Sequence, residues 1–300
     1  MTGDQIARSL RLRAAGRGQW HGQCPTCGYK TGFTVTERRD GLPLLYCHTN
    51  KCSFIDLSAA LRKLGLWPEG KSEAAPWQRH AQTVNPPVQS TDDDRAKKQE
   101  AAQAAAIALW RRSRPITGTL AEIYLRHRGF TGAIPPTVFR FGSCKHRSDG
   151  RFYPALVAAV VMNGDVTNGV AVHRTFLRSD GRGKAEVDPD KMTLGPCRGA
   201  SVPMASASSV VAVAEGIETA LSYMQATGTP TWAALSAGGI RNLILPPEIS
   251  EVVIAADPDP VGMMAARAAA RRWLAEGRKV SIARPPLGLD FNDLARRVAV

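Results

Sequence analysis

Several features that are common in proteins are missing from this sequence, and each absence excludes a class. No apolar run approaches the roughly eighteen residues that a membrane-spanning helix requires, so no membrane partner is expected. Nothing near the N-terminus resembles a signal peptide, and the expected location is therefore the cytoplasm. A Gly-x-x-x-x-Gly-Lys-[Ser/Thr] phosphate loop is also absent, which excludes an ATPase domain of that type within these residues.

Cysteine is scarce, with six in 300 residues, and a disulfide framework is not expected in a reducing compartment. Four of the six nevertheless form two close pairs, Cys24-x-x-Cys27 and Cys47-x-x-x-x-Cys52. Two such pairs brought together by a hairpin supply the four ligands of a tetrahedral zinc ion. The remaining two, Cys144 and Cys197, lack partners nearby in the sequence and are interpreted as packing thiols.

The segment between the cysteine pairs predicts two short strands, about residues 32–37 and 44–46, around a polar turn at residues 38–41. This pattern is typical of a zinc ribbon. The second pair is more widely spaced than usual, so His48 could replace Cys47 as a ligand, and His21 is a weaker candidate.

Acidic residues are few relative to basic ones. Lysine and arginine total 39 against 26 aspartate and glutamate, and the net charge is +13. This surplus favours a polyanionic partner such as nucleic acid, although an arginine-rich solvated surface is the alternative. Four arginines (Arg8, Arg11, Arg13 and Arg17) are expected on a short helix within residues 1–19, and another helix is expected over residues 55–66.

The composition divides the chain into four parts. We expect a zinc-ribbon module over residues 1–66, a flexible linker rich in Pro, Gln, Ser and Thr over 67–99, a mixed basic domain over 100–205 and an α/β domain over 206–300. The fold class is thus α/β in the last domain and α+β overall. A helix is expected over about 94–113, beginning near the end of the linker.

The last region alternates strand and helix. Strands are expected at 210–214, 231–235, 252–256 and 280–283, and helices at 218–226, 261–276 and 291–298. Two of these strands are continuous apolar runs that end abruptly in carboxylates, Glu215 after the first and Asp257 and Asp259 after the third. Strands buried on both faces belong to a parallel sheet, whose carboxyl-end loops form a ligand crevice. Clustered carboxylates there are costly unless a cation neutralises them or a proton is shared, and Mg²⁺ or Mn²⁺ bound with a phosphate substrate suits them. The alternative is that Glu215 and Asp257 only cap the following helices.

These motifs resemble the Toprim domain of bacterial-type primases, topoisomerases and some nucleases. Glu215 matches its lone glutamate, Asp257-x-Asp259-x-x-Gly262 its Asp-x-Asp motif, and residues 290–293 a stretch that often closes such domains. The run from Glu215 to Ala220 resembles the Glu-Gly-x-x-Thr-Ala signature of satellite-phage and conjugative-plasmid primases. The sequence departs from the pattern at Pro258 and Pro260, which stiffen the loop around Asp259.

A ribbon followed by a Toprim-like domain is the order found in bacterial and phage primases. The resemblance implies a ribbon that recognises single-stranded template DNA, a basic domain that grips template and nucleoside triphosphates, and synthesis of short RNA primers. Asp257 and Asp259 would hold Mg²⁺ or Mn²⁺, Glu215 would be a general base or a further ligand, and Glu218 and Asp290 are second-rank candidates. Since a helicase is often fused to such primases and no phosphate loop occurs here, a separate replicative helicase is the expected partner.

The middle region carries the candidate nucleotide- and template-binding residues. A short helix is expected over 120–128 and strands at 137–141, 155–162, 166–177 and 192–194, with Asn163-Gly164 as a hairpin turn. The candidates are placed on one surface: Arg140, His173, Arg174, Lys184 and Lys191. Their alternative is a solvated strand face, with His173 as a satisfied core histidine.

Gly238 and Gly239 follow a strand, where amides could approach a phosphate, or where a turn requires a positive φ. Two other functions stay open. A Toprim nuclease would use the same acids without the triphosphate-binding domain, and a non-catalytic recombination mediator can also combine a zinc module with Toprim. A topoisomerase is disfavoured, because none of the five tyrosines lies in a clear nucleophilic site.

Overall fold

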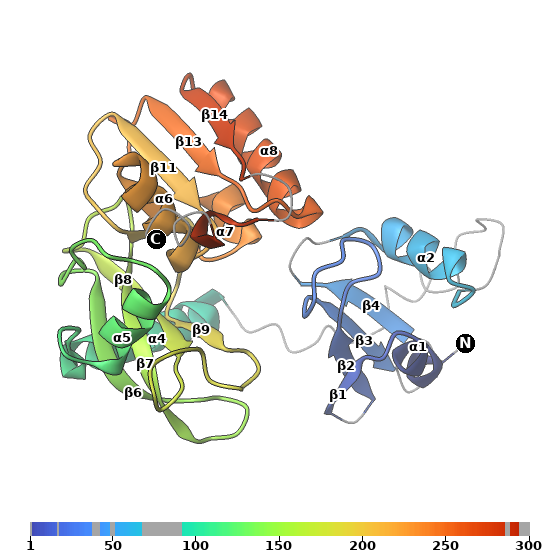
Figure 1. Ribbon diagram of the computed structural model, residues 1–300. Coiled ribbons are helices and arrows are strands. Elements are labelled where there is room, and N and C mark those ends of the chain that lie inside the picture. Colours follow the sequence, from blue (N-terminus) through green and yellow to red (C-terminus); the bar gives the residue numbers. More distant parts are fainter. Residues whose placement is uncertain are drawn as a thin grey trace. The chain divides into compact units, whose positions relative to one another are not determined.

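The computed structural model describes residues 2–16, 18–37, 43–48, 52–67, 92–285 and 289–293. The chain divides into two compact units, Met1–Gln89 and Ser90–Val300. The expected linker over 67–99 spans this division, and most of it lies outside the described residues. Its last part is helical, since helix α4 runs from Asp92 to Arg112 (Figure 1).

The N-terminal unit is a four-stranded antiparallel sheet in the order β1-β2-β3-β4, with one helix before it and one after it. Its elements are α1 (Gly3–Ser9), β1 (Arg13–Gly16), β2 (Gln19–Gly22), β3 (Phe33–Glu37), β4 (Pro43–Cys47) and α2 (Phe54–Lys63). The short helix expected within residues 1–19 is present as α1, but it ends at Ser9, so the placement of Arg11 and Arg13 on it is wrong, and Arg13 already belongs to β1. Arg17 and the expected turn at 38–41 lie outside the described residues.

Unit 2 contains a central sheet that is antiparallel throughout, in the order β5-β6-β7-β8-β9. Its elements are β5 (Arg114–Pro115), β6 (Phe139–Lys145), β7 (Phe152–Val161), β8 (Gly169–Phe176) and β9 (Lys191–Leu194), with helices α4 and α5 (Leu120–His127). The hairpin turn at Asn163-Gly164 is confirmed by positive φ angles of 54° and 71°. A second turn from Asp165 to Asn168 follows it, so β8 begins at Gly169 instead of the expected Val166.

The C-terminal sheet has the order β10-β12-β11-β13-β14, and only the edge strand β10 is antiparallel. Its elements are β10 (Val202–Pro203), β11 (Val210–Ala214), α6 (Ile217–Thr227), β12 (Thr231–Ala233), α7 (Ala237–Asn242), β13 (Glu251–Ala255), α8 (Pro260–Ala275) and β14 (Lys279–Ala283). The predicted parallel α/β alternation is confirmed here. Of the last expected helix, residues 291–293 are helical and the rest lies outside the described residues.

The order of the parallel strands places a topological switch beside β11. From β11 the chain crosses through α6 to β12 on one side, and then through α7 to β13 on the other side. The carboxyl ends of β11 and β13 are neighbours, with Ala214 opposite Ala255. A crevice at such a point is where ligands bind in open α/β sheets.

Two apolar cores cover the two faces of the C-terminal sheet (Figure 1). One face packs on α7 and α8, where Ile240, Ala266 and Trp273 are buried. The other face packs on α6, and this core continues into the central sheet through Leu156 and Val160 of β7. The regions expected as separate domains, 100–205 and 206–300, therefore share one core within unit 2. Among the described helices, none combines the length and apolarity needed to cross a bilayer.

Candidate functional site: a sulfur cluster and an acid crevice

The four paired cysteines of the N-terminal unit converge on one point. The ligand atoms of Cys24, Cys27, Cys47 and Cys52 all lie within 4.8 Å of one another. The Sγ atoms of Cys24 and Cys52 are 3.9 Å apart, and those of Cys27 and Cys47 are 3.8 Å apart. Tetrahedral zinc with Zn–S bonds of about 2.3 Å places its sulfurs roughly 3.8 Å from one another. The thiols are free of disulfides, and their positions fit a tetrahedral metal ion.

His48 does not belong to this cluster. Its ring hydrogen-bonds through Nε2 to the Thr34 hydroxyl at 2.7 Å and packs edge-on against Tyr46 at 4.6 Å between ring centroids. Cys47 is buried and lies with the other thiols, so the four-cysteine set replaces the alternative in which His48 took the place of Cys47. His21 is likewise outside the cluster, with its ring 6.3 Å from that of His48.

The predicted acids lie at the topological switch of the C-terminal sheet. Glu215 directly follows β11, and Asp257 follows the neighbouring β13 after a single alanine. Within the described residues, the cysteines are the one group of three or more potential ligands whose donor atoms approach within 4.8 Å. The acids therefore follow the neighbouring ends of β11 and β13, a place that we call the acid crevice, but the described carboxylates do not form a group as close as that of the four thiols.

Burial and mutual repulsion both disfavour ionisation of the acids. Burial first, and then the negative charges of Asp257 and Asp259, together raise the pKa of Glu215 from 4.5 to about 7. Burial, followed by the charges of Asp259 and Asp290, raises the pKa of Asp257 from 3.8 to about 6. Carboxylates that are costly to ionise become favourable when a divalent cation lies among them. The donor set of this crevice therefore fits Mg²⁺ or Mn²⁺.

Asp259 has a structural task in addition to its charge. It is the N-cap of α8, and its side chain accepts a hydrogen bond of 2.7 Å from the Gly262 backbone N–H. Pro260 occupies the first helical position, where its fixed φ and missing N–H are favourable. The proline that departs from the family pattern thus starts the helix. The capping alternative for Glu215 and Asp257 is therefore wrong, because the N-cap of α6 is Gly216 and the N-cap of α8 is Asp259.

Glu218 is turned toward the basic residues of the central sheet. It is 8 % exposed, and it accepts a hydrogen bond of 2.5 Å from the Tyr124 hydroxyl on α5. Lys191 of β9 donates to its other oxygen at 3.1 Å, and the Lys184 ammonium lies 4.0 Å away. Burial alone would raise the pKa of Glu218, but the two lysines and the hydroxyl outweigh burial and hold the pKa well below its usual range.

The strands of the central sheet divide the predicted basic surface between two faces. Cross-strand partners point to the same face, and Arg140 and Arg174 both lie opposite Val157. This face packs on α4, where Arg140 donates to the carbonyl of Trp110 at 3.0 Å and stacks on its ring at 4.5 Å. Arg174 is buried on the same face, 5.8 Å from the Phe176 ring. A common surface with His173 and Lys191 is thus excluded for Arg140 and Arg174, because alternation along a strand reverses the face at each residue.

His173 and Lys191 lie on the opposite face, toward the acids. His173 is buried and hydrogen-bonds through Nδ1 to the Thr193 hydroxyl at 3.2 Å. Burial, together with the charge of Lys191, lowers the pKa of His173 from 6.5 to about 4. His173 is therefore neutral near pH 7 and suits the core-histidine interpretation better than an electrostatic contact with phosphate.

Gly238 and Gly239 lie in the first turn of α7, and only Gly239 is required by close packing. A Cβ atom at Gly239 would lie 1.8 Å from the Ala234 carbonyl oxygen. The backbone N–H of Gly239 already donates a hydrogen bond of 2.9 Å to Ser236 Oγ. Neither Gly238 nor Gly239 has a positive φ, so the alternative based on a left-handed turn is wrong. The adjacent Ala237 N–H hydrogen-bonds to Glu215, which makes this turn a support of the acid crevice.

Asp290 forms a local turn. Its side chain accepts from the Asp293 N–H at 2.7 Å, while Asp293 accepts from the Asp290 N–H at 3.1 Å. The charge of Asp290 nevertheless contributes to the raised pKa of Asp257, so it lies at the edge of the crevice.

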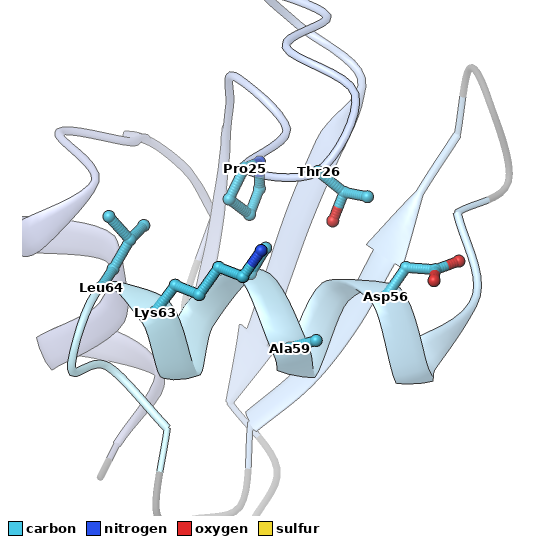
Figure 2. A pocket seen from close by; sticks show the side chains of 7 residues that line it. Pro25, Thr26, Asp56, Ala59, Lys63 and Leu64 are labelled. Atoms are coloured by element: carbon cyan, nitrogen blue, oxygen red, sulfur yellow. The ribbon is translucent and has the colours of Figure 1, made fainter.

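Two shallow hollows lie elsewhere in the described residues. One, of about 410 Å³, lies between the Cys24–Cys27 knuckle and α2. In Figure 2, Lys63, Ala59 and Asp56 lie along α2 beneath Pro25 and Thr26 of the knuckle. The other, of about 520 Å³, borders α5 near Ile123 and Arg182. Neither includes a carboxylate of the crevice, so the acids are the stronger indication of chemistry.

Two participants of the site were not anticipated from the sequence. Tyr124 has the spacing of a core residue on α5, and its contact with Glu218 joins positions far apart in the chain. Asp190 forms an ion pair of 3.0 Å with Lys184, which also lies 4.0 Å from Glu218, so the two acids share one lysine. The only available signal was the density of charge around residues 184–191.

Two known domain families match this sequence. The sequence pattern of the Toprim domain matches residues 210–299, and that of a domain of unknown function (DUF7146) matches residues 100–204. No curated protein matches the chain.

Similar solved structures include three from primases. The zinc-binding and RNA polymerase domains of the Aquifex aeolicus primase are 13 % identical, over 99 % of this chain and 79 % of that chain, with a TM-score of 0.43. The primase fragment of the bacteriophage T7 primase-helicase protein is 14 % identical over 93 % and 95 %, with a TM-score of 0.40. A DNA primase domain from Pseudomonas aeruginosa is 16 % identical over 66 % and 74 %, with a TM-score of 0.43.

Proposed function

Because residues 210–299 belong to the Toprim family, we propose that this chain is a DNA primase that synthesises short RNA primers on single-stranded DNA. The observation that carries the proposal is the acid crevice at the ends of β11 and β13, where the charge of Lys191 from the central sheet acts on both Glu215 and Asp257. Metal-binding carboxylates beside cationic side chains suit a substrate with a triphosphate. A nuclease requires the acids but not the lysines.

The reaction joins two nucleotides. The 3′-hydroxyl of one nucleotide attacks the α-phosphate of an incoming nucleoside triphosphate, a new P–O bond forms, and pyrophosphate leaves with the electrons of the broken bond. Asp257 and Asp259 would hold one or two divalent ions, which stabilise the attacking and leaving oxygens when bound. Glu215, whose pKa is raised to about 7, is poised to accept the hydroxyl proton or to serve as a further ligand.

The N-terminal unit would supply recognition of the template. Its four thiols fit zinc, which would fix the β2–β4 sheet as one rigid surface. The net charge of +13 favours a DNA partner. Single-stranded DNA, nucleoside triphosphates and a separate helicase are the partners that this function requires.

The test is primer synthesis by the full chain on random single-stranded DNA, with labelled ribonucleotides and Mg²⁺ or Mn²⁺. Wild type is compared with Asp257→Asn, Glu215→Gln and the matched control Glu251→Gln, which changes a carboxylate at the opposite end of β13. We expect short labelled products from wild type and control, and none from the two crevice variants. Metal-dependent shortening of the template without products would identify a nuclease instead, and DNA binding without either activity would identify a recombination mediator.

A further inference from the structure

The two lysines beside Glu218 are already neutralised by acids of the protein. Lys191 is 3.1 Å from Glu218, and Lys184 is 3.0 Å from Asp190 and 4.0 Å from Glu218. Glu218 thus lies between the two ammonium groups. In this arrangement neither lysine presents a full positive charge to an incoming anion.

Glu218 is held in this position more firmly than the lysines are. It is 8 % exposed and is anchored by the buried Tyr124, whose hydroxyl donates to Oε1. The side chains of Lys191 and Lys184 are 30 % and 33 % exposed and have flexible stems. Removing both cations from a buried carboxylate would be costly, so at least one ammonium group must stay close to Glu218. If an anion binds here, the lysine side chains are therefore the groups that move, and Glu218 stays in place.

The environment of Glu218 also argues against a role as a metal ligand. One oxygen already accepts from Tyr124 and the other from Lys191, so a metal ion would have to displace or share these donors. The second-rank metal role expected for Glu218 therefore suits this residue less well than a role toward the lysines.

We propose that Glu218 is a resident anion that occupies the lysines in place of substrate phosphate, and that a triphosphate must compete with it for Lys184 and Lys191. This inference rests on the proposed use of nucleoside triphosphates. In the exchange, the ammonium groups turn from carboxylate to phosphate oxygens without any covalent change. A polyanion with several charges competes well, whereas a single phosphate or a sparsely contacting DNA backbone competes poorly. The site therefore selects for triphosphate over the DNA phosphates that a basic protein would otherwise collect.

The experiment measures binding of Mg²⁺-tripolyphosphate to the full chain by titration calorimetry, without template or nucleotide base. Glu218→Gln keeps the size and the acceptor for Tyr124 but removes the competing charge. We expect it to bind tripolyphosphate roughly tenfold more tightly than wild type. The matched control is Glu186→Gln, which changes an exposed acid two residues after Lys184, and it should bind tripolyphosphate as wild type does. Lys191→Met should bind weakly whether or not Glu218 is present.

A thermal melt of each variant guards against misfolding. Without Glu218 the ammonium of Lys191 is left partly buried and unpaired, so Glu218→Gln should melt at a lower temperature. Tripolyphosphate should restore its melting temperature by more than it raises that of wild type, while orthophosphate should not. Equal or weaker binding by Glu218→Gln, including no measurable binding by either protein, overturns the inference. The binding assay does not depend on primer synthesis. If Glu218→Gln binds tripolyphosphate more tightly but the wild type makes no primers in the separate synthesis assay, only the proposed function is contradicted.

Discussion

The two candidate metal centres of this chain differ in how far their donors have already converged. In the N-terminal unit four thiols lie at the separations of a tetrahedral site. In unit 2 the carboxylates share a crevice but stay further apart. Neutral thiols can pack together without repulsion, whereas each carboxylate raises the pKa of its neighbours. Under the proposed function, the contrast suits a structural ion in the first site and, in the second, a replaceable ion that arrives with substrate.

The largest effect should follow removal of a ligand from the sulfur cluster. Cys47→Ser should abolish folding of the N-terminal unit, because zinc binding contributes on the order of 10 kcal/mol in small zinc modules. Unit 2 has separate cores and should stay folded. Metal content and tryptophan fluorescence during chelator titration measure the change, with Cys197→Ser, an exposed thiol outside the cluster, as control. An N-terminal unit that stays folded without metal would remove the contrast between the two sites.

Neutralising the crevice should have the opposite effect on stability. Glu215→Gln should lower primer synthesis by about a hundredfold or more, yet stabilise the metal-free protein at pH 8. The sign follows from the raised pKa: the ionised form is disfavoured in the folded state, so wild type loses stability as the pH rises from 4.5 to about 7. The gain should be on the order of 1–3 kcal/mol. The test is chemical denaturation of both proteins at pH 5 and pH 8, with and without Mg²⁺. The variant should be more stable than wild type only at pH 8 and only without the metal. Equal stability of the two proteins at pH 8 without metal would contradict the raised pKa of Glu215.

A comparable effect on stability is expected from His173 at the wall of the crevice. The pKa of His173 falls from 6.5 to about 4 on folding, so the unfolded chain binds more protons within this window. Stability should therefore decrease as the pH falls from 6.5 toward 4, by on the order of 3 kcal/mol in total from this residue. His173→Gln should lose this part of the pH dependence in denaturation curves, whereas the exposed His127→Gln should keep it. An unchanged slope would mean that water reaches His173.

The smallest effect separates two tasks of one carboxylate. Asp259→Asn keeps an acceptor for the Gly262 N–H and should leave stability within about 0.5 kcal/mol of wild type, while it impairs metal-dependent activity. Asp259→Ala should also lose the cap, at a cost of about 1 kcal/mol. Thermal melts combined with primer assays on the two variants measure this difference. Full activity in Asp259→Asn would reduce Asp259 to a cap and leave the metal to Glu215 and Asp257.

The sequence allowed much of the C-terminal sheet to be predicted, because strands buried on both faces are continuous apolar runs. The acids that follow β11 and β13 could be placed at one edge for the same reason. Strands β1 and β2 were missed, since they are short and contain or adjoin arginine and glycine. The faces of Arg140 and Arg174 could not be known before the register of β6 to β8 was known. The contact of Tyr124 with Glu218 depends on packing between distant segments, which leaves no local pattern.

The single core shared by the central and C-terminal sheets has a consequence for inheritance. Leu156 and Val160 are buried in the same cluster as Ala214 and Ala220, so both regions contribute to one interior. A gene rearrangement that joined either region to a foreign partner would expose apolar surface on both products. The segments 100–204 and 210–299 should therefore have descended together, with substitutions at their common boundary compensating one another.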